Sequence, residues 1–141
     1  MTNEEQEKDY RLLSGLTLAY IGDAIYEVYV RDYLIRTGQT RPNQLHRMAT
    51  HYVSAKAQHY LIELMFEEEL LTEEEQGIYK RGRNAKSHTS AKNTSIQIYR
   101  SSTGFEALIG YLHLTKQQNR LEEMIDWSIQ KIGEKNETTK K

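Results

Sequence analysis

The 141-residue sequence contains no cysteine and only one proline. Without cysteine, disulfide bonds, thiolate metal sites and cysteine nucleophiles are all excluded, and such a composition suits a reducing compartment. One proline and eight glycines leave long stretches free of helix breakers. No alternation of polar and apolar residues is long enough to indicate a strand. The sequence therefore predicts an all-helical protein, and a chain of this length is expected to form one domain with its own core.

Long apolar runs are absent as well. No window approaches the ~20 apolar residues that a membrane-spanning helix needs. The first ten residues, MTNEEQEKDY, have neither the basic start nor the apolar stretch of a signal peptide. We therefore expect a soluble, cytoplasmic protein that has no membrane partner.

Acidic residues are missing from two windows of the sequence, although the net charge of the whole chain is −1. Residues 33–62 include four basic residues and three histidines. Residues 76–105 include six basic residues, namely Lys80, Arg81, Arg83, Lys86, Lys92 and Arg100. A polyanion would therefore meet locally basic surfaces on a nearly neutral protein.

The expected helices cover residues 10–35, 54–68, 96–115 and 119–132, with two shorter helices between the first and the last of these. Gly38 fits a left-handed cap after the first helix, and Pro42 fits the first turn of the next. Thr72 and Glu75 form a T-x-x-E capping box, which predicts a helix start. The polar residues 84–95 are expected to form a loop. Residues 1–9 are expected to be a flexible N-terminus, 10–132 the folded domain and 133–141 a disordered tail.

The first expected helix is apolar on two faces. One face carries Leu18, Ile21, Ile25 and Val28, and the opposite face carries Leu12, Leu16, Ala19, Tyr20 and Val30. A helix of this kind is expected to lie inside the protein. Its second face also carries two carboxylates one turn apart, Asp23 and Glu27. Such a pair is destabilising when buried, unless a cation or hydrogen bonds compensate.

A third acid stands in a similar setting on the expected helix over 96–115. Its core face consists of Ile98, Phe105, Leu108, Ile109 and Leu112, and Glu106 lies opposite among Ser102, Thr103 and Gly110. Small neighbours around one acid leave room for a ligand. A metal site would explain these acids, and so would a set of salt-bridged structural acids. Periodicity alone does not choose between the two.

Two motifs carry a family resemblance. YIGDAIYEVYVR, residues 20–31, and TGFEALIGYL, residues 103–112, resemble the two halves of the ribonuclease III active site, in the same order and about 80 residues apart. YIGDA and the segment KRGRNAKS, residues 80–87, resemble Mini-ribonuclease III, a bacterial subfamily in which the nuclease domain is the whole protein. The resemblance covers residues 12–132. It implies an all-α ribonuclease III-type endonuclease domain, a single helical domain that forms a symmetric homodimer.

The resemblance also implies an activity. Members of the family are Mg²⁺-dependent endoribonucleases, with Mn²⁺ as an alternative ion, that cleave double-stranded RNA and leave 5′-phosphate and 3′-hydroxyl ends. The usual task of the subfamily is maturation of the 23S ribosomal RNA precursor, so a stem of that precursor is the expected RNA partner. Asp23 and Glu106 match catalytic, metal-binding acids of the family. Leu16, Ala19 and Thr103 stand where the family has further acids.

Other residues receive supporting roles from the same resemblance. Glu27 and Thr103 are candidates to support the metal ligands, and an intersubunit salt bridge is the alternative for Glu27. The expected RNA contacts are Lys80, Arg81, Arg83, Asn84, Lys86, Ser87 and Lys92. A solvated basic loop is the alternative for these. No second RNA-binding domain is expected after residue 132, so the nuclease domain itself must hold the RNA.

Three other functions compete with this hypothesis. A non-catalytic RNA-binding or ribosome-associated helical module would keep the fold without the reaction. A nucleotide phosphohydrolase lacks support, because the sequence has no His-Asp dipeptide and no dense E-x-x-E array. A protein–protein adaptor would not explain the basic windows. For the homodimer, Leu12, Leu16, Tyr20 and Val30 form a spare apolar face, and the sequence predicts that a second copy covers part of this face or the turn beyond it.

Overall fold

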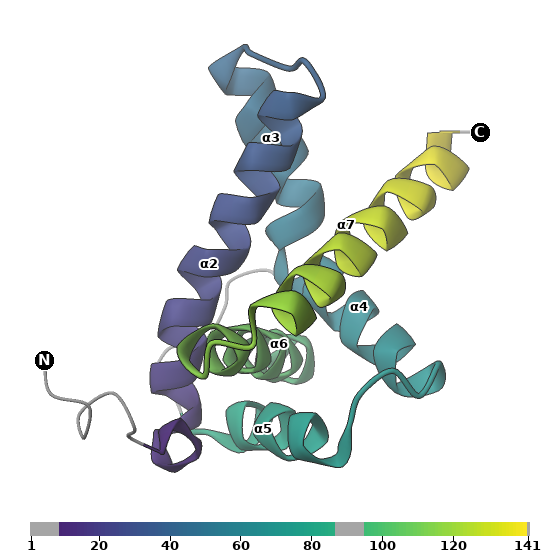
Figure 1. The fold of residues 1–141 in the computed structure, drawn as a ribbon. Helices are drawn as coiled ribbons and strands as arrows, with labels where there is room; N and C mark the ends of the chain where they lie inside the picture. Colours follow the sequence, from purple (N-terminus) through teal and green to yellow (C-terminus); the bar gives the residue numbers. More distant parts are fainter. Residues whose placement is uncertain (1–8, 87–94, 141) are drawn as a thin grey trace, which may run out of the picture.

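The computed structural model describes residues 9–86 and 95–140, without the side chains of 137–140. Within these ranges the chain is helical and contains no strand, so the all-helical prediction is confirmed (Figure 1). The elements are η1 (Tyr10–Leu12), α2 (Gly15–Arg36), α3 (Pro42–Val53), α4 (Ala55–Glu67), α5 (Glu73–Asn84), α6 (Ile96–Leu114) and α7 (Gln118–Lys140).

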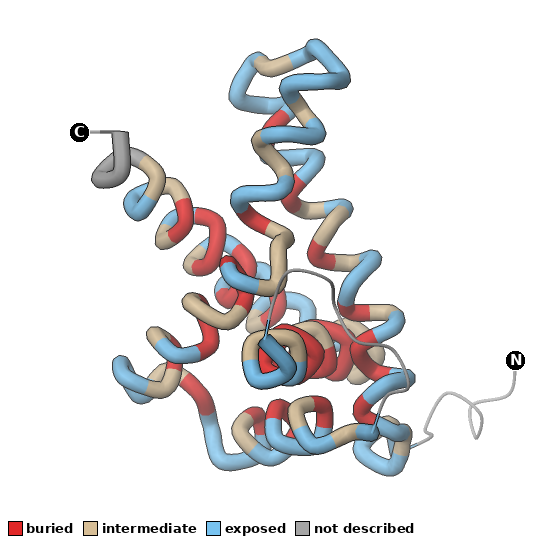
Figure 2. The backbone as a smooth tube through the Cα atoms, turned by 180° about the vertical axis from the view of Figure 1, so that it is seen from behind, coloured by how far each residue is buried: buried red, intermediate tan, exposed pale blue. Residues whose placement is uncertain are grey.

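Helix α6 forms the centre of the molecule. Every residue from 101 to 112 is buried except Glu106, which is half-buried. Helices α2, α4, α5 and α7 all contact α6, and in Figure 1 they surround it. Figure 2 shows the buried residues gathered around α6, whereas the far end of α2 and the start of α3 are exposed. Of the predicted core residues, Phe105, Leu108, Ile109 and Leu112 are buried as expected, whereas Ile98 is only half-buried. The small residues on the opposite side of the helix are buried too.

Two glycines allow α2 to pack closely against α6. A Cβ atom at Gly22 would overlap the backbone carbonyl oxygen of Glu106, and a Cβ atom at Gly110 would overlap that of Leu18. Because neither glycine has a side chain, the two helix backbones touch directly. This contact determines which face of α2 is turned towards the core.

The prediction that α2 is buried on both faces is wrong. Its buried face consists of Gly15, Leu18, Ala19, Gly22, Tyr26, Val30 and Leu34. Val28 is 62% exposed and Tyr20 is 83% exposed, although each belonged to an expected apolar stripe. Each of the two expected apolar stripes therefore has some residues in the core and others on the surface. The reason is that the glycine contact with α6 turns the face centred on Gly22 towards the core.

The first helix also begins later than predicted. The Ser14 hydroxyl accepts a hydrogen bond from the Thr17 backbone N–H at 3.1 Å, so Ser14 caps a helix that starts at Gly15. Residues Tyr10–Leu12 form a separate 3₁₀ turn. The sequence reasoning overlooked this cap.

The predicted end of the first helix and the predicted starts of the next helices agree with the structure, but the last helix continues beyond its predicted end at residue 132. Gly38 has a φ of 102° just after α2, Pro42 opens α3, and Thr72 and Glu75 form the predicted capping box of α5. Helix α7 contains the predicted residues 119–132 and continues to Lys140.

Arg120 fastens α7 to the start of α5. Its Nε and Nη2 atoms donate to the two carboxylate oxygens of Glu75 at 2.9 and 2.8 Å, and Nη2 also donates to the Leu70 carbonyl oxygen at 2.7 Å. Burial raises the pKa of Glu75, but the hydrogen bonds from Arg120 and Thr72, together with the charge of Arg120, outweigh it in sum and hold the pKa below its ordinary value. Glu75 is therefore a structural acid.

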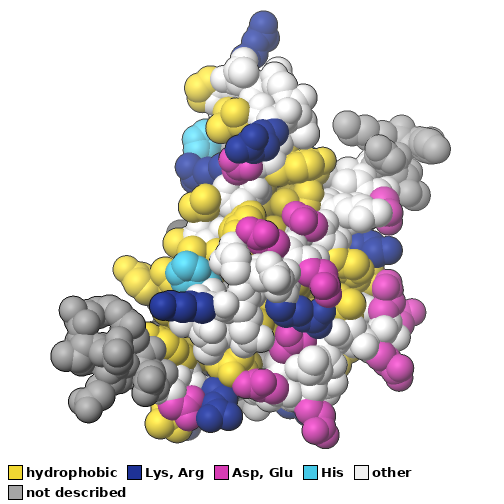
Figure 3. All heavy atoms as spheres, viewed as in Figure 1, with side chains coloured by type: hydrophobic (Ala, Val, Ile, Leu, Met, Phe, Trp, Pro, Cys, Tyr) yellow, Lys and Arg dark blue, Asp and Glu magenta, His cyan; other side chains and the backbone are white. Residues whose placement is uncertain are grey.

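Exposed acidic side chains are concentrated on one part of the surface. Figure 3 shows acidic side chains gathered over α7 and the connection between α4 and α5. The exposed acids of these segments include Glu67, Glu68, Glu69, Glu122, Glu123 and Asp126.

Among the described helices, none is both long and apolar enough to cross a membrane.

Candidate active site

The structure brings together Asp23 and Glu106, the two acids that the sequence assigned to catalysis. Asp23 lies on α2 next to Gly22, and Glu106 lies on α6, against which Gly22 packs. Both line one hollow of about 550 Å³. The other residues that line it are Leu16, Ala19, Tyr20, Ile21, Ala24, Tyr99 and Thr103. The glycine contact between the helices thus places two carboxylates from distant parts of the sequence in one site.

The two carboxylates interact strongly. Burial, followed by the negative charge of Asp23 and a hydrogen bond with Asp23, raises the pKa of Glu106 from 4.5 to about 8. The charge of Glu27 adds to the same effect. Near neutral pH the pair therefore carries fewer than two full negative charges, and a bound cation would favour the fully ionised pair.

None of the acids Asp23, Glu27 and Glu106 is fully buried. The sequence predicted that Asp23 and Glu27 lie on a buried helix face, but Asp23 is exposed and Glu27 is half-buried. The reason is again the one-sided packing of α2. Glu106, on the central helix, is also half-buried, and burial is the largest cause of its raised pKa.

Thr103 and Ala19, two of the positions where the family resemblance led us to expect further acids, line the same hollow. The Thr103 hydroxyl donates to the Tyr99 carbonyl oxygen, one turn earlier on α6, at 3.1 Å. Ala19 is buried and carries no polar group. Thr103 therefore lies where a supporting residue would have to lie, but its hydroxyl proton is already engaged.

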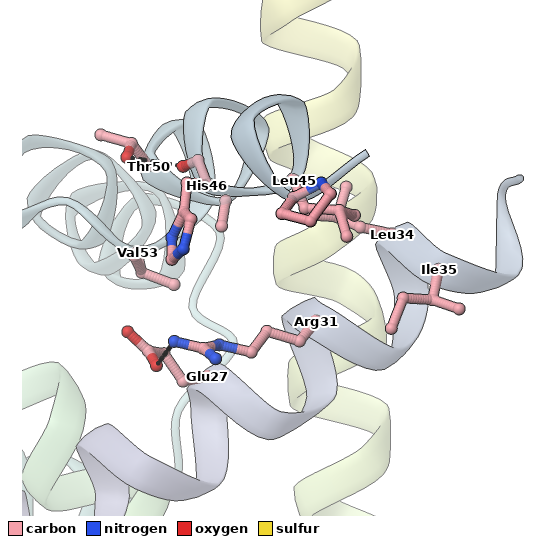
Figure 4. A pocket seen from close by; sticks show the side chains of 10 residues that line it. Glu27, Arg31, Leu34, Ile35, Leu45, His46, Thr50 and Val53 are labelled. Carbon is pink, nitrogen blue, oxygen red and sulfur yellow. Dashed lines mark hydrogen bonds and ion pairs between the residues drawn. The ribbon is translucent and has the colours of Figure 1, made fainter. Parts of the chain in front are cut away.

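Glu27 lies in the neighbouring hollow, between α2 and α3. Its Oε2 atom accepts from Arg31 Nη2 at 2.8 Å, one turn along the same helix. Figure 4 shows this ion pair facing His46 and Val53 of α3, in a hollow of about 260 Å³. The described chain thus gives Glu27 an ion-pair partner on its own helix.

Gln58 is a site residue that the sequence reasoning missed. This α4 side chain is 1% exposed, and its Nε2 atom donates to the Val53 carbonyl oxygen at 3.3 Å and to Glu106 Oε2 at 3.5 Å. A signal was present in the sequence, because Gln58 lies beside Ala57, Leu61, Ile62 and Met65, which are buried on the same helix. A glutamine in such a stripe needs partners inside the protein.

The predicted RNA contacts are mostly on a helix. Lys80, Arg81, Arg83 and Asn84 occupy the last turns of α5, not a loop, and the exposed Lys86 follows it. Ser87 and Lys92 lie outside the described residues. The non-helical segment expected from residue 84 therefore begins only after Asn84, because the helix capped by Thr72 continues for three full turns.

These basic side chains differ in their contacts. Arg81 Nη1 donates to the Leu13 carbonyl oxygen at 3.1 Å. Arg83 lies over the Tyr79 ring, 5.6 Å from its centroid, and its Nε atom donates to Asn84 Oδ1 at 3.2 Å. A hollow of about 400 Å³ between α5 and α6 is lined by Arg83, Asn84, Ile96, Gln97 and Arg100. The structure thus adds Arg100 to the basic group, from the same acid-free window.

The donor set suits a hard divalent cation. Within the described ranges, no three histidine, aspartate or glutamate side chains are grouped so as to hold a metal. Mg²⁺ does not need such a group, because it keeps several waters and takes one or two carboxylates together with substrate phosphate oxygens. Two close carboxylates, one with a raised pKa, fit an ion of this type.

The chain is similar to known proteins over most of its length. The family model described as the ribonuclease III domain matches residues 16–117. The chain is 66% identical over 130 residues to Mini-ribonuclease 3 of Enterococcus faecalis, covering 92% of this chain and 98% of that protein. It is 47% identical to Mini-ribonuclease 3 of Staphylococcus aureus, covering 94% and 99%. A crystal structure of a protein from Fusobacterium nucleatum has a TM-score of 0.76 and 32% identity, covering 88% of this chain and 98% of that one.

Proposed function

The chain belongs to the ribonuclease III family and is an endoribonuclease, and on this premise we propose that Asp23 and Glu106 are its catalytic, metal-binding pair. The observation that carries the proposal is their shared hollow, in which the charge of Asp23 helps to raise the pKa of Glu106. The substrate is double-stranded RNA. The cofactor is Mg²⁺, with Mn²⁺ as an alternative.

The residues of the hollow bind and position the reacting groups. Asp23 and Glu106 present carboxylate oxygens from two helices that glycine contacts hold at a fixed separation. Ala19 and Ala24 also line the hollow, and their small side chains leave space for a phosphate next to the two carboxylates. When bound, Mg²⁺ supplies an activated water and offsets negative charge on the phosphate oxygens. The products have 5′-phosphate and 3′-hydroxyl ends.

The basic residues at the end of α5 are proposed to hold the RNA backbone. Arg83, Asn84 and Arg100 line one hollow, and Lys86 is exposed beside it. Duplex RNA is recognised by its shape, through phosphates and 2′-hydroxyls, which such side chains can contact. We propose that the physiological substrate of the enzyme is a stem of the 23S ribosomal RNA precursor. The proposal follows the usual task of the Mini-ribonuclease III subfamily, whose members share most of their length with this chain.

A homodimer is part of the proposal. Cleavage of both strands of a duplex needs two sites, and a twofold axis supplies them from one sequence. Leu12 and Tyr20 are each 83% exposed and Leu16 is 39% exposed, and two of these three residues line the hollow of Asp23 and Glu106. Val30 was expected on the same face but is fully buried within the chain, so it is excluded from the interface.

The decisive experiment replaces each acid by its amide. Asp23→Asn and Glu106→Gln should each reduce Mg²⁺-dependent cleavage of duplex RNA by several orders of magnitude and leave duplex binding intact. Asp32→Asn is the matched control, because Asp32 is an exposed acid of α2 that pairs with Arg36 outside the hollow. Cleavage by either site variant at the wild-type rate would refute the assignment. For the physiological RNA, the test is mapping the ends of 23S ribosomal RNA in cells that lack the protein.

A further inference from the structure

Gln58 connects a third helix to the candidate active site. Among its neighbours on α4, it is a polar side chain in a row of buried apolar ones, and only 1% of it is exposed. Burial of an amide is unfavourable unless its hydrogen-bonding groups are satisfied. The two partners of Gln58 Nε2 are the Val53 carbonyl oxygen and Glu106 Oε2.

The bond to Val53 decides which way the amide points. A backbone carbonyl oxygen only accepts hydrogen bonds, so the NH₂ group of Gln58 has to face it. The same NH₂ group has a second hydrogen, and Glu106 Oε2 lies 3.5 Å from its nitrogen. The Gln58 side-chain amide therefore donates a hydrogen bond to one oxygen of the Glu106 carboxylate.

A second glutamine, Gln76, makes only one of these two kinds of contact and so allows their effects to be told apart. Gln76 holds the same position in α5 as Gln58 holds in α4, four residues after the capping residue. Its Nε2 atom donates to the Leu71 carbonyl oxygen at 3.1 Å, again five residues earlier. The bond from a glutamine to the carbonyl before a helix is thus a recurring way to fasten a helix start. The contact with Glu106 is what Gln58 adds.

We propose that Gln58 is a positioning residue for the nuclease reaction, holding the Glu106 carboxylate in the orientation that binds a divalent cation together with Asp23. It acts through Glu106 and does not touch the substrate. This inference rests on the proposed function of Asp23 and Glu106. Neighbours that orient metal ligands typically change metal affinity or activity about 10- to 100-fold when they are replaced.

The test compares Gln58→Met with Gln76→Met. Methionine is close to glutamine in length but donates no hydrogen bond, so each variant loses the bond at a helix start and only the first loses the contact with Glu106. Mn²⁺ binding to the RNA-free protein is measured by electron paramagnetic resonance, alongside kcat and KM for duplex RNA over a range of Mg²⁺ concentrations. We expect Gln58→Met to weaken Mn²⁺ binding about tenfold and to lower kcat at limiting Mg²⁺, with KM for RNA unchanged. Gln76→Met should leave Mn²⁺ binding at the wild-type level.

A double-mutant cycle keeps the test decisive if Gln58→Met is less stable. In a Glu106→Gln background, Gln58→Met should have no further effect on Mn²⁺ binding, because the carboxylate it positions is gone. Wild-type Mn²⁺ affinity in Gln58→Met, or equal losses with and without Glu106, would overturn the inference. If Asp23→Asn and Glu106→Gln themselves bind Mn²⁺ as the wild type does, the proposed metal site fails instead.

Discussion

Gly22 on α2 packs directly against the backbone of Glu106 on α6, and Asp23 is the next residue along α2. The close approach of the two helices therefore also sets the separation of the two carboxylates. A change at Gly22 acts on the core and on the candidate site at once.

Gly22→Ala should destabilise the protein severely. A methyl group there would overlap the Glu106 carbonyl oxygen, and backbone cannot rotate away as a side chain can. We expect a loss of at least about 3 kcal/mol in the free energy of unfolding, at the upper end for overpacking. Urea denaturation measures it. The matched control is Gly77→Ala on α5, where nothing lies within 4 Å of the added atom and about 0.5–1 kcal/mol of stabilisation is expected. Equal stabilities for the two variants would show that the helices are not in backbone contact.

The stability of the metal-free protein should fall as pH rises towards 8. The pKa of Glu106 is raised from 4.5 to about 8 in the folded protein, so the folded state binds the proton more tightly than the unfolded state does. This contribution is fully present below pH 4.5 and is lost as pH rises through about 8, by up to roughly 1.4 kcal/mol per pH unit between the two values. Unfolding in the presence of a chelator should show it. Glu106→Gln removes the titrating group, so the difference between variant and wild type should grow with pH in favour of the variant. A difference that does not change with pH would contradict the assigned environment.

Removal of basic residues beside α6 should weaken RNA binding in a salt-dependent way. Arg83→Ala and Lys86→Ala should each lower the steepness of log affinity against log salt by roughly 0.7–0.9, by analogy with DNA. The reason is that RNA binding releases fewer counterions when one phosphate contact is missing. Arg81 was expected to act in the same way, but it donates to the Leu13 carbonyl oxygen, so Arg81→Ala should also lower stability. Lys131→Ala on α7, where Lys131 lies beside Trp127, serves as the control for charge alone. An unchanged slope in folded Arg83→Ala and Lys86→Ala would place the RNA elsewhere.

The protein should sediment as a dimer. At micromolar concentration we expect about twice the chain mass of 16.6 kDa. Tyr20→Glu should shift the population to monomer, because it puts a charge on an 83%-exposed aromatic residue at the proposed interface. Ile35→Glu changes another exposed apolar residue near the opposite end of α2 and should leave the dimer intact. A monomeric wild-type protein that cuts both strands at matched positions would contradict the proposed arrangement.

The helix ends show how far local sequence determines this fold. Gly38, Pro42 and the Thr72–Glu75 capping box act within a few residues, so the sequence alone predicts them. The buried face of α2 could not be predicted in the same way. Both of its faces are apolar, and the choice depends on glycine contacts with a helix that lies about 80 residues later.

The candidate site divides along the same line. Asp23 and Glu106 could be identified because each lies in a motif that resembles a known family. Gln58 has no such motif, and its role depends on a contact between α4 and α6 that only the folded chain contains. The surroundings of Glu27 also follow from packing, since Glu27 lines the hollow between α2 and α3 and not the hollow that Asp23 lines.

The central place of α6 has a consequence for the cell that makes this enzyme. During synthesis, α2 with Asp23 leaves the ribosome first, and Glu106 follows only when most of the chain has been translated. Until α6 has emerged and docked, Asp23 and Glu106 have no common hollow, so the proposed cation site has not yet formed. Under the proposed assignment, the nuclease site is complete only once α6 has docked against α2.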